Sequence, residues 1–144
     1  MIRRLPRLLR DRHGAAAVEF GLLAPAFLLM FLGVLQVGVG LHAYNSLRNV
    51  SSDTARQVSV QYQTDNRLSN SQIRSVGIAN ATTAPYLLKT DRLTVTADDA
   101  ATQRVPNARE ITLRFQYRVP TFLEFAGIQG PQLSYARPIF VSLG

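Results

Sequence analysis

The sequence predicts an α+β fold: a long N-terminal helix crosses a membrane and extends into a small domain that holds a short second helix and a three- to four-stranded antiparallel sheet. An apolar run from Gly21 to Leu41, interrupted only by Gln36, predicts the membrane span. Apolar residues then recur at three- and four-residue steps, and the second half of the chain alternates apolar and polar residues as strands do. The expected segments are a basic cytoplasmic leader over residues 1–14, a transmembrane helix over residues 15–44 and an extracytoplasmic α+β domain over residues 45–144.

The net charge of +7 is concentrated at the N-terminus, where residues 1–14 carry five arginines against Asp11. From residue 41 onward, eleven basic and seven acidic residues are dispersed without a basic cluster that includes aromatic residues, so nucleic-acid binding is not expected. The positive-inside rule places the leader in the cytoplasm and the domain across the membrane. The arginines of the leader are Arg3, Arg4, Arg7, Arg10 and Arg12.

The predicted membrane helix has a suitable length, because about 20 apolar residues span a hydrocarbon layer of about 30 Å. Pro25 lacks the N–H that would bond to the carbonyl of Gly21, so we expect a mild kink or local unwinding there. The amphipathic pattern predicts that the same helix continues to about residue 62. The residues of its apolar face are Leu47, Val50, Thr54, Val58 and Tyr62.

Shorter elements follow the long helix. Ser69 and Gln72 have the spacing of a capping box, which predicts a second helix over residues 70–84, closed by Pro85. Alternation predicts strands over residues 93–97, which Asp98 and Asp99 end, and over residues 110–119 and 133–141, and Pro138 assigns the last one to a sheet edge. We expect the amphipathic half of the long helix to cover the apolar face of this sheet.

Two surface features of the domain have expected roles. Glu110, Arg114 and Arg118 share one face of the second strand and are expected to form a solvated sheet surface. The connection from Phe122 to Ile128 is apolar. It either closes the edge of the sheet as a lid or forms a docking surface for another subunit.

Ligand and catalytic chemistry are not expected. The chain has no cysteine, which excludes disulfides and thiolate chemistry, and His13 and His42 have no acidic partner at ligand spacing. Asp98 and Asp99 are expected in a solvated turn, with calcium binding as the alternative. We therefore predict that the protein is not an enzyme and uses no metal, cofactor or small-molecule substrate.

Glu19 stands at the edge of the apolar run, where a carboxylate costs up to roughly 2.5–3.5 kcal/mol on insertion scales, and Gly14 lies upstream of it. A secretory signal peptide does not fit, because the apolar run is too long and no small-residue cleavage site follows it. The sequence has Arg3 and Arg4 but lacks the rest of a twin-arginine signal motif. A mitochondrial presequence would be amphipathic, whereas this segment is uniformly apolar. An uncleaved anchor fits the length and charge but does not explain Gly14 and Glu19.

The stretch Gly14-Ala-Ala-Ala-Val-Glu-Phe, after a basic leader and before an apolar run, resembles the processing site of type IV prepilins. Extended to Pro25, it is more closely similar to the TadE-like pseudopilins of the tight adherence (Tad) system. The resemblance implies that a prepilin peptidase cuts between Gly14 and Ala15. Glu19 is then the fifth residue of the mature chain, and Phe20 stands where the Flp subclass has tyrosine.

The resemblance also implies how the protein acts. Glu19 of one subunit pairs with the N-terminus of a neighbour and sets the axial register, with compensation of the helix dipole as the alternative role. The chain is then a minor pseudopilin or assembly factor of a Flp (type IVb) pilus, with a pilin-like domain outside the bacterial inner membrane. Its partners are the prepilin peptidase, other pilin-like subunits and the Tad secretion platform.

Other interpretations stay open beside this one. An uncleaved single-pass anchor that carries a periplasmic binding module is the alternative function, and a TadF- or TadG-like role is the alternative within the system. The segment from Asp53 to Arg56 and the strand pattern from Ile111 to Val141 are also similar to the TadE-like family. The sequence thus predicts a resemblance that extends over the whole chain.

Overall fold

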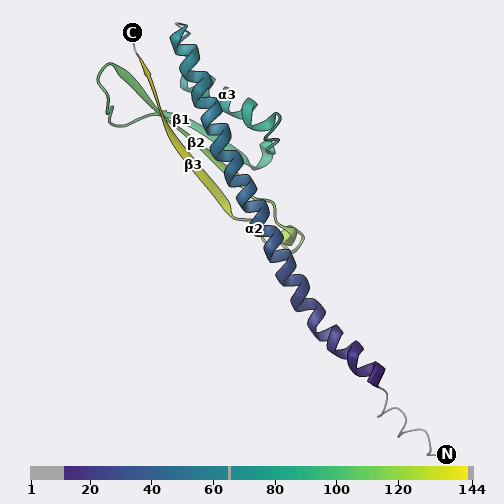
Figure 1. Cartoon of the computed structure of the whole chain (residues 1–144). Coiled ribbons are helices and arrows are strands. Elements are labelled where there is room, and N and C mark those ends of the chain that lie inside the picture. The colour runs from purple at the N-terminus through teal and green to yellow at the C-terminus, as the bar shows by residue number, and fades with distance from the viewer. Residues whose placement is uncertain (1–11, 65, 143–144) are drawn as a thin grey trace, which may run out of the picture. The chain divides into compact units, whose positions relative to one another are not determined.

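The computed structural model of this protein describes residues 12–64 and 66–142 (Figure 1). These residues form two α-helices, α2 (Arg12–Gln63) and α3 (Asn70–Thr82), followed by an antiparallel sheet, which confirms the predicted α+β fold. Most of the predicted leader, residues 1–11, lies outside the described residues. The other elements are the 3-10 helices η1 (Thr90–Arg92) and η2 (Phe122–Ala126) and the strands β1 (Leu93–Asp99), β2 (Ala108–Arg118) and β3 (Gln132–Ser142).

Helix α2 joins the apolar and amphipathic segments in one element, as predicted. It begins at Arg12, earlier than the predicted start at residue 15, and its end at Gln63 agrees with the prediction. The helix continues through Pro25, where a kink stays a prediction. It is long and apolar enough to cross a membrane, and none of its most apolar window is buried, so it fits a single-pass anchor. The chain divides between Gly38 and Val39 into two compact units.

The second unit contains a three-stranded sheet with the order β1-β2-β3. Phe115 of β2 lies opposite Val95 of β1 and Tyr135 of β3, which places three apolar residues on one face. All three strands agree with the predicted ranges to within about two residues, the usual uncertainty at the ends of elements. Strand β3, which contains Pro138, has a neighbour on one side only and is the predicted edge strand.

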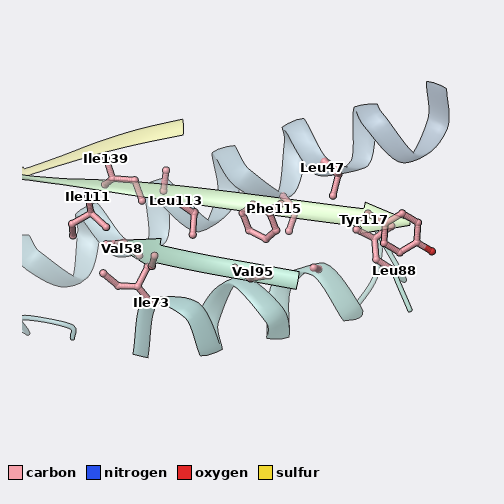
Figure 2. Close-up of a cluster of buried hydrophobic side chains, with 14 of the residues drawn as sticks. Leu47, Val58, Ile73, Leu88, Val95, Ile111, Leu113, Phe115, Tyr117 and Ile139 are labelled. Atoms are coloured by element: carbon pink, nitrogen blue, oxygen red, sulfur yellow. The ribbon is translucent and has the colours of Figure 1, made fainter. Parts of the chain in front are cut away.

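The apolar face of the sheet packs against the amphipathic half of α2 (Figure 2). Figure 2 shows Leu47 toward the Tyr117 end of β2 and Val58 toward Ile111, so this half of α2 follows the length of the strand. The predicted cover of the sheet is therefore confirmed. The fully buried residues of α2 and β2 are Leu47, Val50, Ser51, Thr54, Val58, Ile111, Leu113 and Phe115.

Helix α3 packs on the same core through a close contact that was not predicted from the sequence. The predicted capping box of Ser69 and Gln72 is present, although the helix ends at Thr82 and not at residue 84. A Cβ atom at Gly77 would lie 3.1 Å from Cγ1 of Val95 and 3.2 Å from Cζ of Phe115. The absence of a side chain at Gly77 therefore lets the helix backbone lie directly on the sheet.

We expect Gly77→Val to destabilise the domain by about 1–3 kcal/mol, because the new side chain overpacks the contact with Val95 and Phe115. Urea unfolding of the full chain in a mild detergent, followed by tyrosine fluorescence, measures this change. Ala79→Val is the matched control, since Ala79 is exposed on the same helix and its substitution costs only the lower helix propensity of valine. Equal destabilisation by the two variants would contradict the role of Gly77.

Candidate functional site

The predicted processing and assembly residues lie together at the N-terminal end of α2. Gly14, Ala15, Glu19 and Phe20 are all helical and exposed. Ala15 and Glu19 are four residues apart, so they occupy the same face of the helix on successive turns. Side chains on a helix tilt toward its N-terminus, which directs the Glu19 side chain toward the Ala15 end. A new amino group at Ala15 would therefore share this face with the carboxylate.

The helix geometry places Glu19 at the edge of a membrane-sized segment. From Phe20 to Leu41, α2 rises by about 32 Å at 1.5 Å per residue, which matches a hydrocarbon layer of about 30 Å. Glu19 then lies at one boundary of the layer, while His42 and Tyr44 lie beyond the other. A carboxylate at this boundary costs less than one at the centre of the layer, where insertion is most expensive.

The Gly14–Ala15 peptide bond lies inside α2. Cleavage of this bond therefore requires the first turn of α2 to unwind. Glycine favours that step, because its helix propensity is about 1 kcal/mol poorer than that of alanine. A Cβ atom at Gly14 would have no neighbour within 4 Å, so packing does not explain a glycine at this position.

The segment from Asp53 to Arg56 of α2 forms hydrogen bonds with the end of α3 and with the turn that follows it. The Tyr86 hydroxyl donates a hydrogen bond of 2.6 Å to Oδ2 of Asp53, and this bond, together with burial, raises the pKa of Tyr86 to about 12. Asn80 donates to Oγ1 of Thr54 at 3.2 Å and to Oε1 of Gln57 at 3.0 Å. This part of α2 therefore has a structural role in the domain.

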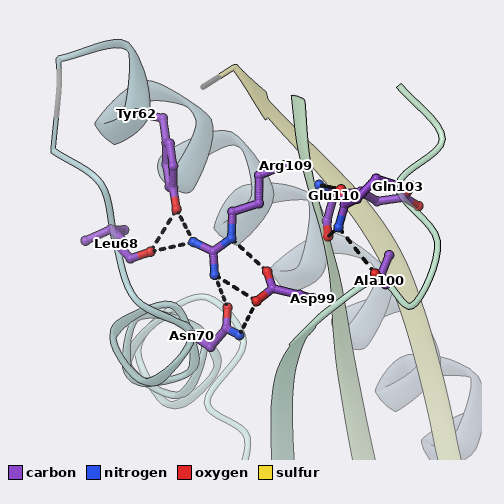
Figure 3. Close-up of polar contacts among 8 residues, drawn as sticks. All are labelled: Tyr62, Leu68, Asn70, Asp99, Ala100, Gln103, Arg109 and Glu110. Atoms are coloured by element: carbon purple, nitrogen blue, oxygen red, sulfur yellow. Dashed lines mark hydrogen bonds and ion pairs between the residues drawn. The ribbon is translucent and has the colours of Figure 1, made fainter. Parts of the chain in front are cut away.

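Arg109 joins four parts of the domain at the end of the sheet where β1 ends and β2 begins (Figure 3). Its Nη1 donates to the Tyr62 hydroxyl at 2.6 Å and to the carbonyl of Leu68 at 3.2 Å, and its Nη2 donates to Oδ1 of Asn70 at 2.9 Å. Its Nε lies 2.7 Å from Oδ1 of Asp99, and this contact lowers the pKa of Asp99. The end of α2, the connection that contains Leu68, the start of α3 and the end of β1 are thus fixed to one guanidinium group.

This arrangement corrects the expectation for Asp98 and Asp99. Both residues belong to β1 and not to a turn, and Arg109 donates to both carboxylate oxygens of Asp99. Among the residues that the structure describes, no group of three or more His, Cys, Asp or Glu residues is placed to hold a metal ion.

Glu110 is buried, so its predicted place on a solvated surface is wrong, while Arg114 and Arg118 are exposed as expected. The connection between β1 and β2 brings Arg104 onto the carboxylate, where its Nε donates to Oε1 at 2.9 Å and its Nη2 makes a second contact. The Arg104 guanidinium lowers the pKa of Glu110. Gln103 accepts the backbone N–H of Glu110 at 2.6 Å, which completes the contacts of this connection (Figure 3).

The connection from Phe122 to Ile128 contains η2 and is fixed by an ion pair. Arg92 donates to both carboxylate oxygens of Glu124, at 2.5 and 2.8 Å, and this contact lowers the pKa of Glu124 to about 2. Phe122, Phe125 and Ile128 nevertheless remain exposed. This exposure argues against the lid, because a lid would bury these side chains.

Comparison with known proteins identifies one family. Residues 14–56 match the model of a family described as TadE-like protein. The match begins at Gly14, includes Glu19, Phe20 and Pro25, and ends after the Asp53–Arg56 segment. Searches of curated proteins and of solved structures gave no match. The predicted resemblance from Ile111 to Val141 lies outside the matched segment and stays a prediction.

Proposed function

We propose that this chain, which is TadE-like over residues 14–56, is a minor pseudopilin or assembly factor of a tight adherence (Flp/type IVb) pilus. A prepilin peptidase removes the leader after Gly14. The mature protein crosses the bacterial inner membrane once, with its N-terminus at the cytoplasmic side and its domain in the periplasm or outside the cell. It acts through contacts with other pilin-like subunits and the Tad secretion platform, not through catalysis.

The observation that carries this proposal is the position of Gly14 and Glu19 on α2. The family match begins at Gly14, and Glu19 lies one helical turn beyond the Ala15 end, at the boundary of the apolar segment. Cleavage would create a positive amino group at that boundary. An amine and a carboxylate in a low-dielectric setting each need a counter-charge, which a neighbouring subunit supplies when the two chains are correctly staggered.

The apolar half of α2 provides the surface for such contacts. Its large side chains are exposed, as Phe27, Leu29 and Met30 illustrate. Cβ atoms added at Gly33, Gly38 and Gly40 would have no neighbour within 4 Å, so another helix can approach the backbone closely at these glycines. Helix packing along this segment, with Glu19 fixing the axial register, is the mechanism that we propose.

The N-terminal sequence and intact mass of the membrane-extracted protein test the proposal. We expect a mature chain that begins at Ala15 when the cells contain an active prepilin peptidase. Retention of residues 1–14 in those cells would overturn the processing and favour an uncleaved anchor that carries a periplasmic binding module.

A further inference from the structure

One end of the domain faces the point at which α2 enters it. The rings of Tyr44 on α2 and Tyr135 on β3 are in edge-to-face contact, with centroids 6.1 Å apart. Tyr135 lies near the start of β3, and Leu133 pairs with Tyr117 near the end of β2. The connection over residues 119–131 therefore lies at the end of the domain that is next to Tyr44. Because the apolar run of α2 ends at Leu41, this is the membrane-proximal end.

A second connection reaches the same end. Leu93, the first residue of β1, pairs with Tyr117, so the residues before it lie beside the end of β2. Figure 2 shows Leu88 next to Tyr117. The connection over residues 83–92, between α3 and β1, is thus also membrane-proximal. We call these two connections, residues 83–92 and 119–131, the proximal surface.

The proximal surface exposes large apolar side chains from both connections. Phe125 is 87% exposed, Leu87 is 69% exposed and Ile128 is 53% exposed. Leu87 also has a φ of 50°, a left-handed conformation that costs a residue with a Cβ atom about 1–2 kcal/mol. The turn therefore holds a leucine outward in spite of unfavourable hydration and backbone strain.

Cationic side chains accompany these apolar ones. Lys89 and Arg118 are exposed at this end of the domain, and Arg118 and Ile128 line an open hollow of about 440 Å³. The acidic Glu124 is paired with Arg92, which leaves Asp91 as the other carboxylate of this surface. Exposed aromatic and aliphatic tips beside lysine and arginine are typical of surfaces that lie at a bilayer interface.

We propose that the proximal surface rests on the extracytoplasmic face of the membrane that α2 crosses. Phe125, Leu87 and Ile128 enter the interfacial layer, and Lys89 and Arg118 lie at the level of the lipid phosphates. The contact fixes the orientation of the domain on the bilayer and thus the face that it presents to other subunits. This inference rests on the membrane anchoring in the proposed function.

Tryptophan fluorescence tests the contact directly, because the chain contains no tryptophan. The full chain is reconstituted in vesicles of phosphatidylcholine and phosphatidylglycerol, with or without bromine on the acyl chains. We expect Phe125→Trp to lose most of its emission in the brominated vesicles. Phe140→Trp is the matched control, since Phe140 is 43% exposed near the far end of β3 and should keep its emission.

A third variant separates this inference from the proposed anchoring. Phe31→Trp lies in the apolar half of α2 and should be quenched whether or not the domain contacts the bilayer. Quenching of Phe31→Trp without quenching of Phe125→Trp would overturn the contact and leave the anchor intact. No quenching of Phe31→Trp would overturn both. A Phe125→Trp emission that shifts to the blue as the protein density rises, and that bromine does not quench, would assign the surface to a neighbouring subunit and overturn the lipid contact.

Discussion

A Gly14→Ala substitution is expected to leave the chain at full length in cells that carry an active prepilin peptidase. The Gly14–Ala15 bond lies inside α2, and the first turn must unwind before the peptidase can reach it. Alanine opposes this unwinding by about 1 kcal/mol and adds a Cβ atom beside the bond. Intact mass of the membrane fraction measures the effect, which should be a loss of nearly all mature product.

The control for this experiment is Gly21→Ala. Gly21 also lies in α2, and a Cβ atom added there would have no neighbour within 4 Å, so the substitution has the same chemistry at a place remote from the expected cut. We expect Gly21→Ala to be processed like the unchanged chain. A normal amount of product that begins at Ala15 from the Gly14→Ala variant would contradict the assignment of Gly14.

The parts of the fold that follow from local patterns were predictable. The repeat from Leu47 to Val58 identified the buried face of α2, because a helix places such residues on one side. The capping box of Ser69 and Gln72 identified the start of α3, because its two residues are close in sequence and lie within one turn of the helix. Alternation along β2 likewise identified its buried face.

The parts that depend on contacts between distant residues were not predictable. Arg109 lies 47 residues from Tyr62 in the sequence, and nothing near it in β2 indicates that contact. Gly77 interrupts an otherwise weak apolar face, and its close approach to Val95 depends on how α3 sits on the sheet. Glu110 follows the alternation of a solvated face, and only the fold of residues 100–107 brings Arg104 onto it.

The features of the candidate site also divide into those that local sequence patterns predict and those that depend on contacts between distant residues. Gly14 and Glu19 could be identified from the sequence because their spacing along one helix carries the signal. The apolar connection from Phe122 to Ile128 left two roles open, since its place relative to α2 depends on the pairing of β2 with β3. The structure places the connection at the Tyr44 end of the domain and leaves Phe125 exposed, which argues against the lid.

Replacing Glu19 with alanine is expected to leave cleavage after Gly14 intact and to abolish pili. The residue lies beyond the scissile bond on an exposed part of α2, so its loss does not disturb packing within the chain. In an assembly, however, it removes the counter-charge from the N-terminus of a neighbour. An uncompensated charge costs about 3–5 kcal/mol when the pair is buried. N-terminal sequencing and electron microscopy of the same cells check both parts, and normal pili would remove the register role.

A second variant distinguishes the register role of Glu19 from compensation of the helix dipole. Combining Glu19→Ala with Ala16→Glu keeps a carboxylate in the first turn of the mature helix, where dipole compensation contributes about 0.3–1 kcal/mol. It also moves the charge by about 4.5 Å along the helix axis and rotates it by about 60° around that axis. If Glu19 acts on the dipole, the double variant should restore pili. If Glu19 fixes the stagger between subunits, it should not, because the neighbour's amine no longer meets the carboxylate.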